Sequence, residues 1–295
     1  MKRWLMPVLA GGLLGACGSD ASSTIEVSAF GLAEADPAVG ITVEQSADRY
    51  AVTFSNVIVE FEGFYARTTG GLDADLDPSP VLVELVPTGA SDVYRFPGVD
   101  ARRWDDVGYA SAPPPADVEV LEGVDPALAQ RMIDEGWSQL IAGTMTAPDG
   151  EVFPFELGFP MAIEYTNCSN GTDRTLGVVA PVNGVAQVEL TWHLTHLFFD
   201  SFGENSELRM EPFAAVYDGV NPISMEDLDQ QRLSGVVDRD GEILRDEEGN
   251  FVVYIPPSLS DRPALTLRDH VLGARFGHFN GLEGFCETAP PVIFD

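Results

Sequence analysis

Histidines are the residues of this 295-residue chain whose types and spacing point most directly to chemistry. His193 and His196 stand three residues apart, and His278 and His270 lie near the C-terminus. Neutral imidazoles together with a carboxylate such as Asp200 form a ligand set that suits Zn²⁺, Cu²⁺ or Ni²⁺. The pattern predicts a zinc or copper site with His193, His196 and His278 as ligands. Asp200 is predicted to be a further ligand or to orient a histidine, and His270 is assigned a structural role.

The backbone around the H-x-x-H pair decides whether both imidazoles reach one ion. On a regular strand, residues i and i+3 point to opposite faces of the sheet. A strand that ends or bulges at Leu194–Thr195 would bring the two rings together. A helical turn from His196 would then place Asp200, four residues on, on the same face. The alternative is a structural pair in which His193 is exposed and His196 packs among aromatic side chains.

The first residues of the chain have the pattern of a bacterial lipoprotein signal. Lys2 and Arg3 precede a short apolar stretch that ends in Leu-Gly-Ala-Cys at residues 14–17, which resembles the lipobox. We expect a signal peptide at residues 1–16 and acyl chains on Cys17, which would tether the protein to a membrane of the cell envelope. Gly18 after the cysteine favours the outer membrane. The alternative is an ordinary signal peptide that is cut elsewhere.

Two further cysteines remain if Cys17 is lipidated. Cys168 and Cys286 form an even pair in an oxidising compartment, which predicts a disulfide. The bridge would close a long loop and stabilise the fold by up to about 5 kcal/mol. It would also hold the C-terminal segment against the body, so that His278 approaches His193. The competing interpretation is two free thiols that bind metal, although the chain has no C-x-x-C spacing.

The composition excludes nucleic acid as a partner. The chain has 47 acidic against 16 basic residues and a formal net charge of −31, whereas binding to phosphates requires a cationic surface. Such an acidic surface keeps a protein soluble and attracts cations weakly and without specificity. The sequence identifies no protein partner.

Strand signals dominate the rest of the chain. Runs rich in β-branched and aromatic residues, such as 50–61 and 184–199, alternate with Gly, Pro and Asn turns. The pattern predicts a mostly β fold with an antiparallel, sandwich-like architecture of one large or two packed β units. One short helix is predicted from Asp125-Pro126 to Gly136. Another is predicted from Ser224, with Asp227 closing a capping box.

Changes in composition suggest boundaries along the chain. We expect a flexible, lipidated leash at residues 17–23 and an N-terminal β unit at 24–112. A Pro-rich linker with the first helix would follow at 113–136. A C-terminal β unit at 137–295 would carry the metal site.

Two segments resemble motifs of an uncharacterised family of acidic bacterial lipoproteins. One is the H-x-x-H-L-F-x-D block at residues 193–200. The other is the tail at 272–286, which is similar to a GHF-x-G-x-G-x-C ending. The resemblance implies a paired-histidine site that the C-terminal histidine joins. Where the family often has one more histidine, this chain has Phe285, and the family brings no assigned activity.

Other functions have weaker support. Calcium could use the alternating carboxylates of Asp73–Asp77, but no glycine follows to make an EF-hand turn, and a β-meander turn explains Asp238–Gly241. The chain lacks G-x-S-x-G, H-E-x-x-H and a phosphate-binding glycine-rich loop, so we expect no enzyme. A metal-dependent hydrolase is the enzymatic alternative. An envelope structural or adhesion module without metal is the other.

Overall fold

The computed structural model describes residues 21–32, 40–76, 78–86, 89–203, 205–246, 248–259, 263–280 and 284–294. The predicted signal peptide and the predicted lipid attachment site Cys17 lie outside these residues. Within the described part of the chain, no helix has the length and apolar character needed to cross a bilayer.

The described residues form mostly strands, as predicted. The strands are β1 (Ser22–Leu32), β2 (Ala51–Phe61), β3 (Gly63–Arg67), β4 (Val81–Glu84), β5 (Ser91–Asp100), β6 (Arg103–Trp104), β7 (Asp106–Ser111), β8 (Glu119–Val120), β9 (Gln139–Thr146), β10 (Val152–Phe159), β11 (Met161–Ser169), β12 (Val178–Val179), β13 (Val185–His193), β14 (Gly277–Phe279), β15 (Phe285–Thr288) and β16 (Val292–Ile293). The helices are α1 (Pro126–Glu135), α2 (Glu211–Ala214) and α3 (Leu267–Leu272), with 3₁₀ turns η1 (Leu194–Leu197) and η2 (Asp227–Gln230).

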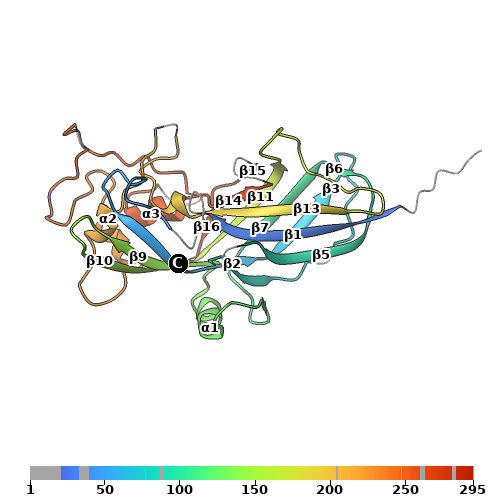
Figure 1. The fold of residues 1–295 in the computed structure, drawn as a ribbon, viewed down its shortest axis with the longest axis horizontal. Helices are drawn as coiled ribbons and strands as arrows, with labels where there is room; N and C mark the ends of the chain where they lie inside the picture. The colour runs from blue at the N-terminus through green and yellow to red at the C-terminus, as the bar shows by residue number, and fades with distance from the viewer. Residues whose placement is uncertain are drawn as a thin grey trace, which may run out of the picture.

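Three larger sheets form the body, and Figure 1 shows the long strands β1, β5 and β13 side by side. The strand orders are β14-β13-β1-β5, β10-β9-β2-β4-β8 and β15-β11-β7-β3. Most pairs are antiparallel, whereas β1 and β13 run parallel, as do β4 and β8. The predicted mostly β, sandwich-like architecture is confirmed.

The two predicted β units share their sheets. Each larger sheet combines strands from residues 24–112 with strands from residues 137–295. The long parallel pairing of β1 with β13 joins Thr24 to Val185 and continues to Leu32 and His193. The segment 113–136 is therefore an excursion within one fold, and the structure has one large β unit in place of two consecutive ones.

The predicted leash is shorter than expected at its C-terminal end. Ser22 and Ser23 already belong to β1, where Ser23 pairs with Val99. The Ser23 hydroxyl also donates a hydrogen bond to the Gly184 carbonyl at 3.1 Å. These sheet contacts satisfy the polar groups of small residues that composition alone assigned to a flexible segment.

The two predicted helices have different outcomes. Helix α1 forms as expected, because the Asp125 carboxylate accepts from the Ala127 amide at 2.7 Å and Gly136 adopts the left-handed conformation. The second is only the 3₁₀ turn η2. Asp227 does accept from the Ser224 amide at 2.9 Å, but the chain becomes extended at Gln231, whose side chain bonds to neighbouring backbone groups.

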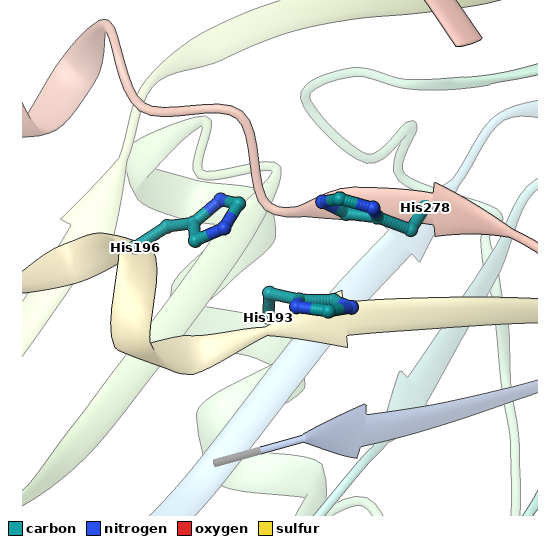
Figure 2. A group of neighbouring side chains, drawn as sticks. All are labelled: His193, His196 and His278. Carbon is teal, nitrogen blue, oxygen red and sulfur yellow. The ribbon is translucent and has the colours of Figure 1, made fainter. Parts of the chain in front are cut away.

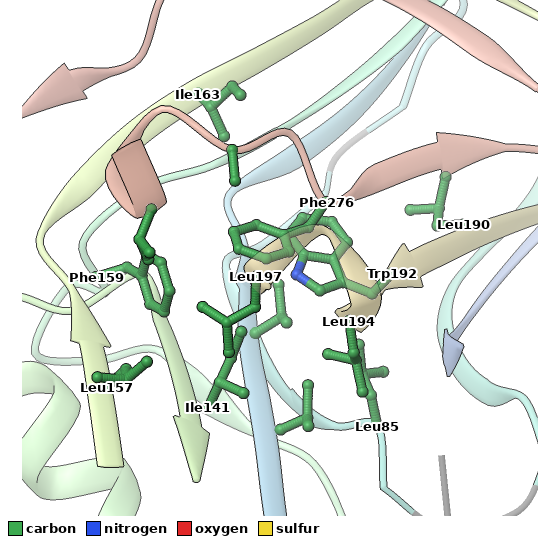
Figure 3. Close-up of a cluster of buried hydrophobic side chains, with 14 of the residues drawn as sticks. Leu85, Ile141, Leu157, Phe159, Ile163, Leu190, Trp192, Leu194, Leu197 and Phe276 are labelled. Atoms are coloured by element: carbon green, nitrogen blue, oxygen red, sulfur yellow. The ribbon is translucent and has the colours of Figure 1, made fainter. Parts of the chain in front are cut away.

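An aromatic core fixes the strand that carries two of the histidines. Trp192 on β13 is fully buried, stacks on Phe276 and donates to the Gln139 side chain at 3.3 Å. Figure 3 shows the indole and the Phe276 ring among aliphatic side chains of several strands. Because side chains alternate along a strand, burying Trp192 directs His193 to the opposite face.

Candidate metal centre

The end of β13 brings His193 and His196 together. Strand β13 ends at His193, and the 3₁₀ turn η1 begins at the next residue. The buried side chains of Leu194 and Leu197 anchor this turn in the core. The predicted strand end at Leu194–Thr195 is confirmed, and it removes the opposed orientation that a continuous strand would impose on the two rings.

Strand β14 supplies the third histidine. It pairs antiparallel with β13, with His278 opposite Thr191, and the His193 amide donates to the Phe276 carbonyl at 2.8 Å. A Cβ added at the neighbouring Gly277 would lie 2.3 Å from the Tyr109 hydroxyl. Gly277 therefore faces the core, and His278 points to the other side, toward the end of β13.

His193, His196 and His278 form a compact cluster, here called the histidine triad. Each offers a nitrogen, and the three atoms lie within 4.8 Å of one another. The ring centroid of His193 is 3.9 Å from that of His278, and the ring of His196 lies 5.4 Å from both. Figure 2 shows the three rings gathered between η1 and β14. A tetrahedral ion with bonds of ~2.1 Å holds its nitrogens about 3.4 Å apart. The rings of His193 and His278 are stacked with an interplanar angle of 27°, so metal binding would require them to turn their nitrogens toward a common point.

Hydrogen bonds orient two of the rings and leave nitrogens without partners. His196 Nδ1 donates to the Arg275 carbonyl, which leaves the lone pair of Nε2 available. The ring of His278 bonds to the Gly284 backbone. Among the described residues, His193 Nε2 and His278 Nδ1 are buried and have no hydrogen-bond partner. A metal ion would satisfy both, whereas Nδ1 of His270, outside the triad, is also without a partner among the described residues.

Burial keeps the triad neutral. It lowers the pKa of His193 to about 3, and the adjacent imidazoles of His278 and His196 contribute in the same direction. Burial, followed by the neighbouring His196, lowers the pKa of His278 to about 4. The pKa of His196 is also lowered by burial, against the raising effect of its hydrogen bond to Arg275. Metal binding requires neutral imidazole, so the three side chains are in the ligating form at neutral pH.

Asp200 does not join the triad. Turn η1 stops at Leu197, and Phe199 then forms a bridge with Leu208, so the helical path predicted from His196 to Asp200 is absent. The Asp200 carboxylate instead accepts from Arg209 Nε at 3.2 Å and from the Glu207 amide at 3.1 Å. The Asp200 carboxylate, which the sequence assigned to the metal or to an imidazole, is therefore paired with Arg209 instead.

His270 has the structural surroundings expected of it. It is fully buried on α3 and its Nε2 donates to the Phe199 carbonyl at 2.7 Å. Its ring lies between those of Phe202 and Tyr254, at centroid distances of 5.3 and 5.1 Å.

The predicted disulfide is present. Cys168 at the end of β11 is bonded to Cys286 on β15 with an S–S distance of 2.06 Å. The bridge fastens the C-terminal segment next to β11, eight positions after His278. The alternative of two free thiols as metal ligands is thereby removed.

Carboxylates contribute no comparable cluster. In the part of the chain that the structure describes, the group of three or more close metal-ligand atoms consists of histidines. Asp238 caps a turn, because its carboxylate accepts the amides of Asp240 and Glu242 at 3.0 and 2.9 Å. Asp73 forms an ion pair with Arg67 at 2.7 Å, and Asp77 lies outside the described residues. These contacts match the turn interpretation rather than a calcium loop.

Sequence reasoning missed two residues that shape the site. Arg275 and Gly284 each orient an imidazole through a backbone group. Every residue type has a carbonyl, so no side-chain pattern identifies such a role. The available signal was position, since both lie in the tail motif that contains His278.

Comparisons with known proteins identify no family for this chain. No protein-family model matches the chain, and no curated protein matches it. Among solved structures, MbnP from Methylosinus trichosporium is similar with a TM-score of 0.33 and 12% sequence identity, over 60% of this chain and 78% of that one. A TM-score of this size does not establish a shared fold.

Proposed function

We propose that this protein binds one copper or zinc ion through the histidine triad. The observation that carries the proposal is the convergence of three neutral imidazoles, with buried nitrogens of His193 and His278 that no described residue satisfies. Two chain segments that are distant in sequence form the cluster, so it is a product of the fold and not of a local repeat.

The donor set favours copper or zinc over calcium and magnesium. Imidazole nitrogens suit zinc and copper, whereas calcium and magnesium take oxygen ligands. The nearest acidic residue along the H-x-x-H block, Asp200, is engaged by Arg209. A non-catalytic role, such as holding or transferring the ion, is the simplest function for such a site, because the sequence contains none of the hydrolase motifs considered above.

Metal analysis of untagged protein tests the proposal. The protein is exposed to equal copper and zinc, dialysed, and measured by inductively coupled plasma mass spectrometry. We expect about one ion per chain for the wild type and a loss of most of it for His196→Ala and His193→Ala. His270→Gln is the matched control, because it removes an imidazole outside the triad and keeps a donor for the Phe199 carbonyl. Equal metal in the wild type and both triad variants would end the proposal and leave the structural or adhesion module.

The second part of the proposal concerns location. We propose that the protein is an envelope lipoprotein tethered through Cys17. The support is the Leu-Gly-Ala-Cys segment, together with a disulfide of the kind that persists outside the cytoplasm. In cells, the wild type should fractionate with membranes and take up labelled palmitate, whereas Cys17→Ser should do neither. Membrane association of the unlabelled variant at wild-type level would refute the lipid tether.

A further inference from the structure

A cavity opens beside the histidine triad. Its volume is about 280 Å³. Two triad members line it together with an arginine and apolar side chains: His196, His278, Arg275, Phe202, Pro257 and Phe285. An ion bound by three protein ligands keeps a further coordination position open for an exogenous ligand, and this cavity adjoins the ligating rings.

The guanidinium of Arg275 has no carboxylate partner among the described residues. It donates to the Gly273 carbonyl and, from Nε, to the Thr288 hydroxyl at 3.2 Å. The other described arginines that are not exposed, Arg209 and Arg268, each form an ion pair with an aspartate. The lack of a described carboxylate partner for Arg275 is unusual in a chain with 47 acidic and 16 basic residues.

Charge accumulates at this cavity once a metal binds. Three neutral imidazoles leave the charge of a divalent ion uncompensated, and Arg275 adds a further positive charge. Burial already disfavours the charged form of Arg275 and lowers its pKa. Partly buried like charges are costly unless a counter-charge is present, and an arginine fork is well suited to hold an anion.

We propose that the cavity binds a small anion that coordinates the triad metal and accepts hydrogen bonds from Arg275. This inference rests on the proposed metal site. The cavity has room for roughly nine water molecules at about 30 Å³ each, so it accommodates a ligand of up to about nine non-hydrogen atoms. Its apolar walls, Phe202, Pro257 and Phe285, accommodate a short carboxylic acid as well as an inorganic anion.

Anion titrations of the copper-loaded full chain test this proposal. Azide and butyrate are added separately to the Cu²⁺ protein, and binding is followed by electron paramagnetic resonance and, for azide, by its charge-transfer absorption. We expect saturable binding of at least one of the two. Tighter binding of butyrate would assign the cavity to carboxylates, and binding of azide alone would assign it to inorganic anions.

Variants separate the anion site from the metal site. Arg275→Gln should weaken anion binding about 10-fold to 100-fold, as expected for lost hydrogen bonds to a charged group, with copper content unchanged. The carbonyl of residue 275 that orients His196 is retained in this variant. Arg268→Gln is the matched control, because that arginine pairs with Asp229 and does not line the cavity, so its replacement should leave both measurements unchanged.

A second variant keeps the test decisive if Arg275→Gln folds poorly. Phe285 is 58% exposed at the cavity, so Phe285→Glu should fold and place a carboxylate where the exogenous anion binds. It should weaken anion binding at least about 10-fold relative to Phe285→Gln. If the wild type binds neither copper nor zinc, the proposed function fails. If copper binds fully but neither anion does, or neither Arg275→Gln nor Phe285→Glu changes anion affinity, the anion site alone is refuted.

Discussion

Acidification should leave metal binding by the triad almost unchanged down to about pH 5. A proton competes with the metal for an imidazole only when the pH approaches the pKa of the metal-free side chain. Burial sets the pKa of His193 at about 3 and that of His278 at about 4, against the usual 6.5. Both pKa values lie below pH 5, so neither imidazole takes up an appreciable proton in the folded protein.

The expected effect follows from the fraction of neutral imidazole. At pH 5 a histidine with a pKa of 6.5 is neutral in about one molecule in 33, so two such ligands would lower the affinity about 1000-fold. With pKa values of about 3 and 4, the corresponding loss is about 10%. Metal affinity measured by equilibrium dialysis in non-coordinating buffers should therefore be nearly flat between pH 7.5 and 5, apart from the contribution of His196.

The stability of the metal-free protein, unlike its metal affinity, should fall on acidification. The folded pKa values of His193 and His278 are depressed, so below pH 6.5 the unfolded chain takes up protons that the folded protein does not. The contribution of the two imidazoles to the free energy of unfolding is present above pH 6.5. It is lost toward pH 4, at about 1.4 kcal/mol per pH unit for each imidazole. Circular dichroism must confirm folding at each pH used for dialysis. A fall in affinity of 100-fold or more between pH 7.5 and 5, in protein that is still folded, would refute the assignment of buried, neutral ligands.

Three further predictions concern the residues around the site. Replacing both Cys168 and Cys286 by serine should lower the free energy of unfolding by about 2–5 kcal/mol in urea denaturation, and an unchanged midpoint would contradict the bridge's role. Asp200→Asn should lower it by about 1–3 kcal/mol, because Arg209 loses a buried charge partner, while metal affinity stays the same; a large loss of metal would restore Asp200 as a ligand. Burial raises the pKa of Glu60 to about 8. The contribution of Glu60 to the free energy of unfolding is therefore present below pH 4.5 and is lost as the pH rises through 8. The free energy of unfolding of Glu60→Gln, relative to that of the wild type, should therefore rise by about 3 kcal/mol between pH 4.5 and 7. A difference between the two proteins that does not change with pH would contradict the raised pKa of Glu60.

The histidine triad could be predicted because few residues in the chain are able to form such a site. Four histidines and one cysteine pair leave few combinations, and the H-x-x-H spacing required a strand end that β13 provides. Helix α1 was equally accessible, since Asp125 and Gly136 mark its ends by local hydrogen bonding and backbone conformation. These features depend on residues close in sequence or on a covalent bond.

The features that sequence reasoning missed depend on distant partners. The direction of Asp200 is set by the bridge between Phe199 and Leu208 and by the position of Arg209. The division into two β units failed because β1 pairs with β13, across more than half of the chain, and alternating hydrophobicity gives no information on which strands are neighbours. Helical spacing was the only guide for Asp200, and it applies only where a helix continues.

The metal and the disulfide would act on the same segment from opposite ends. Residues 277–279 belong to the sheet of β13, whereas Cys286 is fastened to β11 in a different sheet. A metal bound by His193, His196 and His278 joins the first end to the body, and the disulfide joins the second. Because an ion that binds only the folded state stabilises it by mass action, the metal should protect strand β14 from local opening most strongly when the disulfide is reduced. Under the proposed function, strand β14 would be both part of the binding site and the element that the bound ion stabilises.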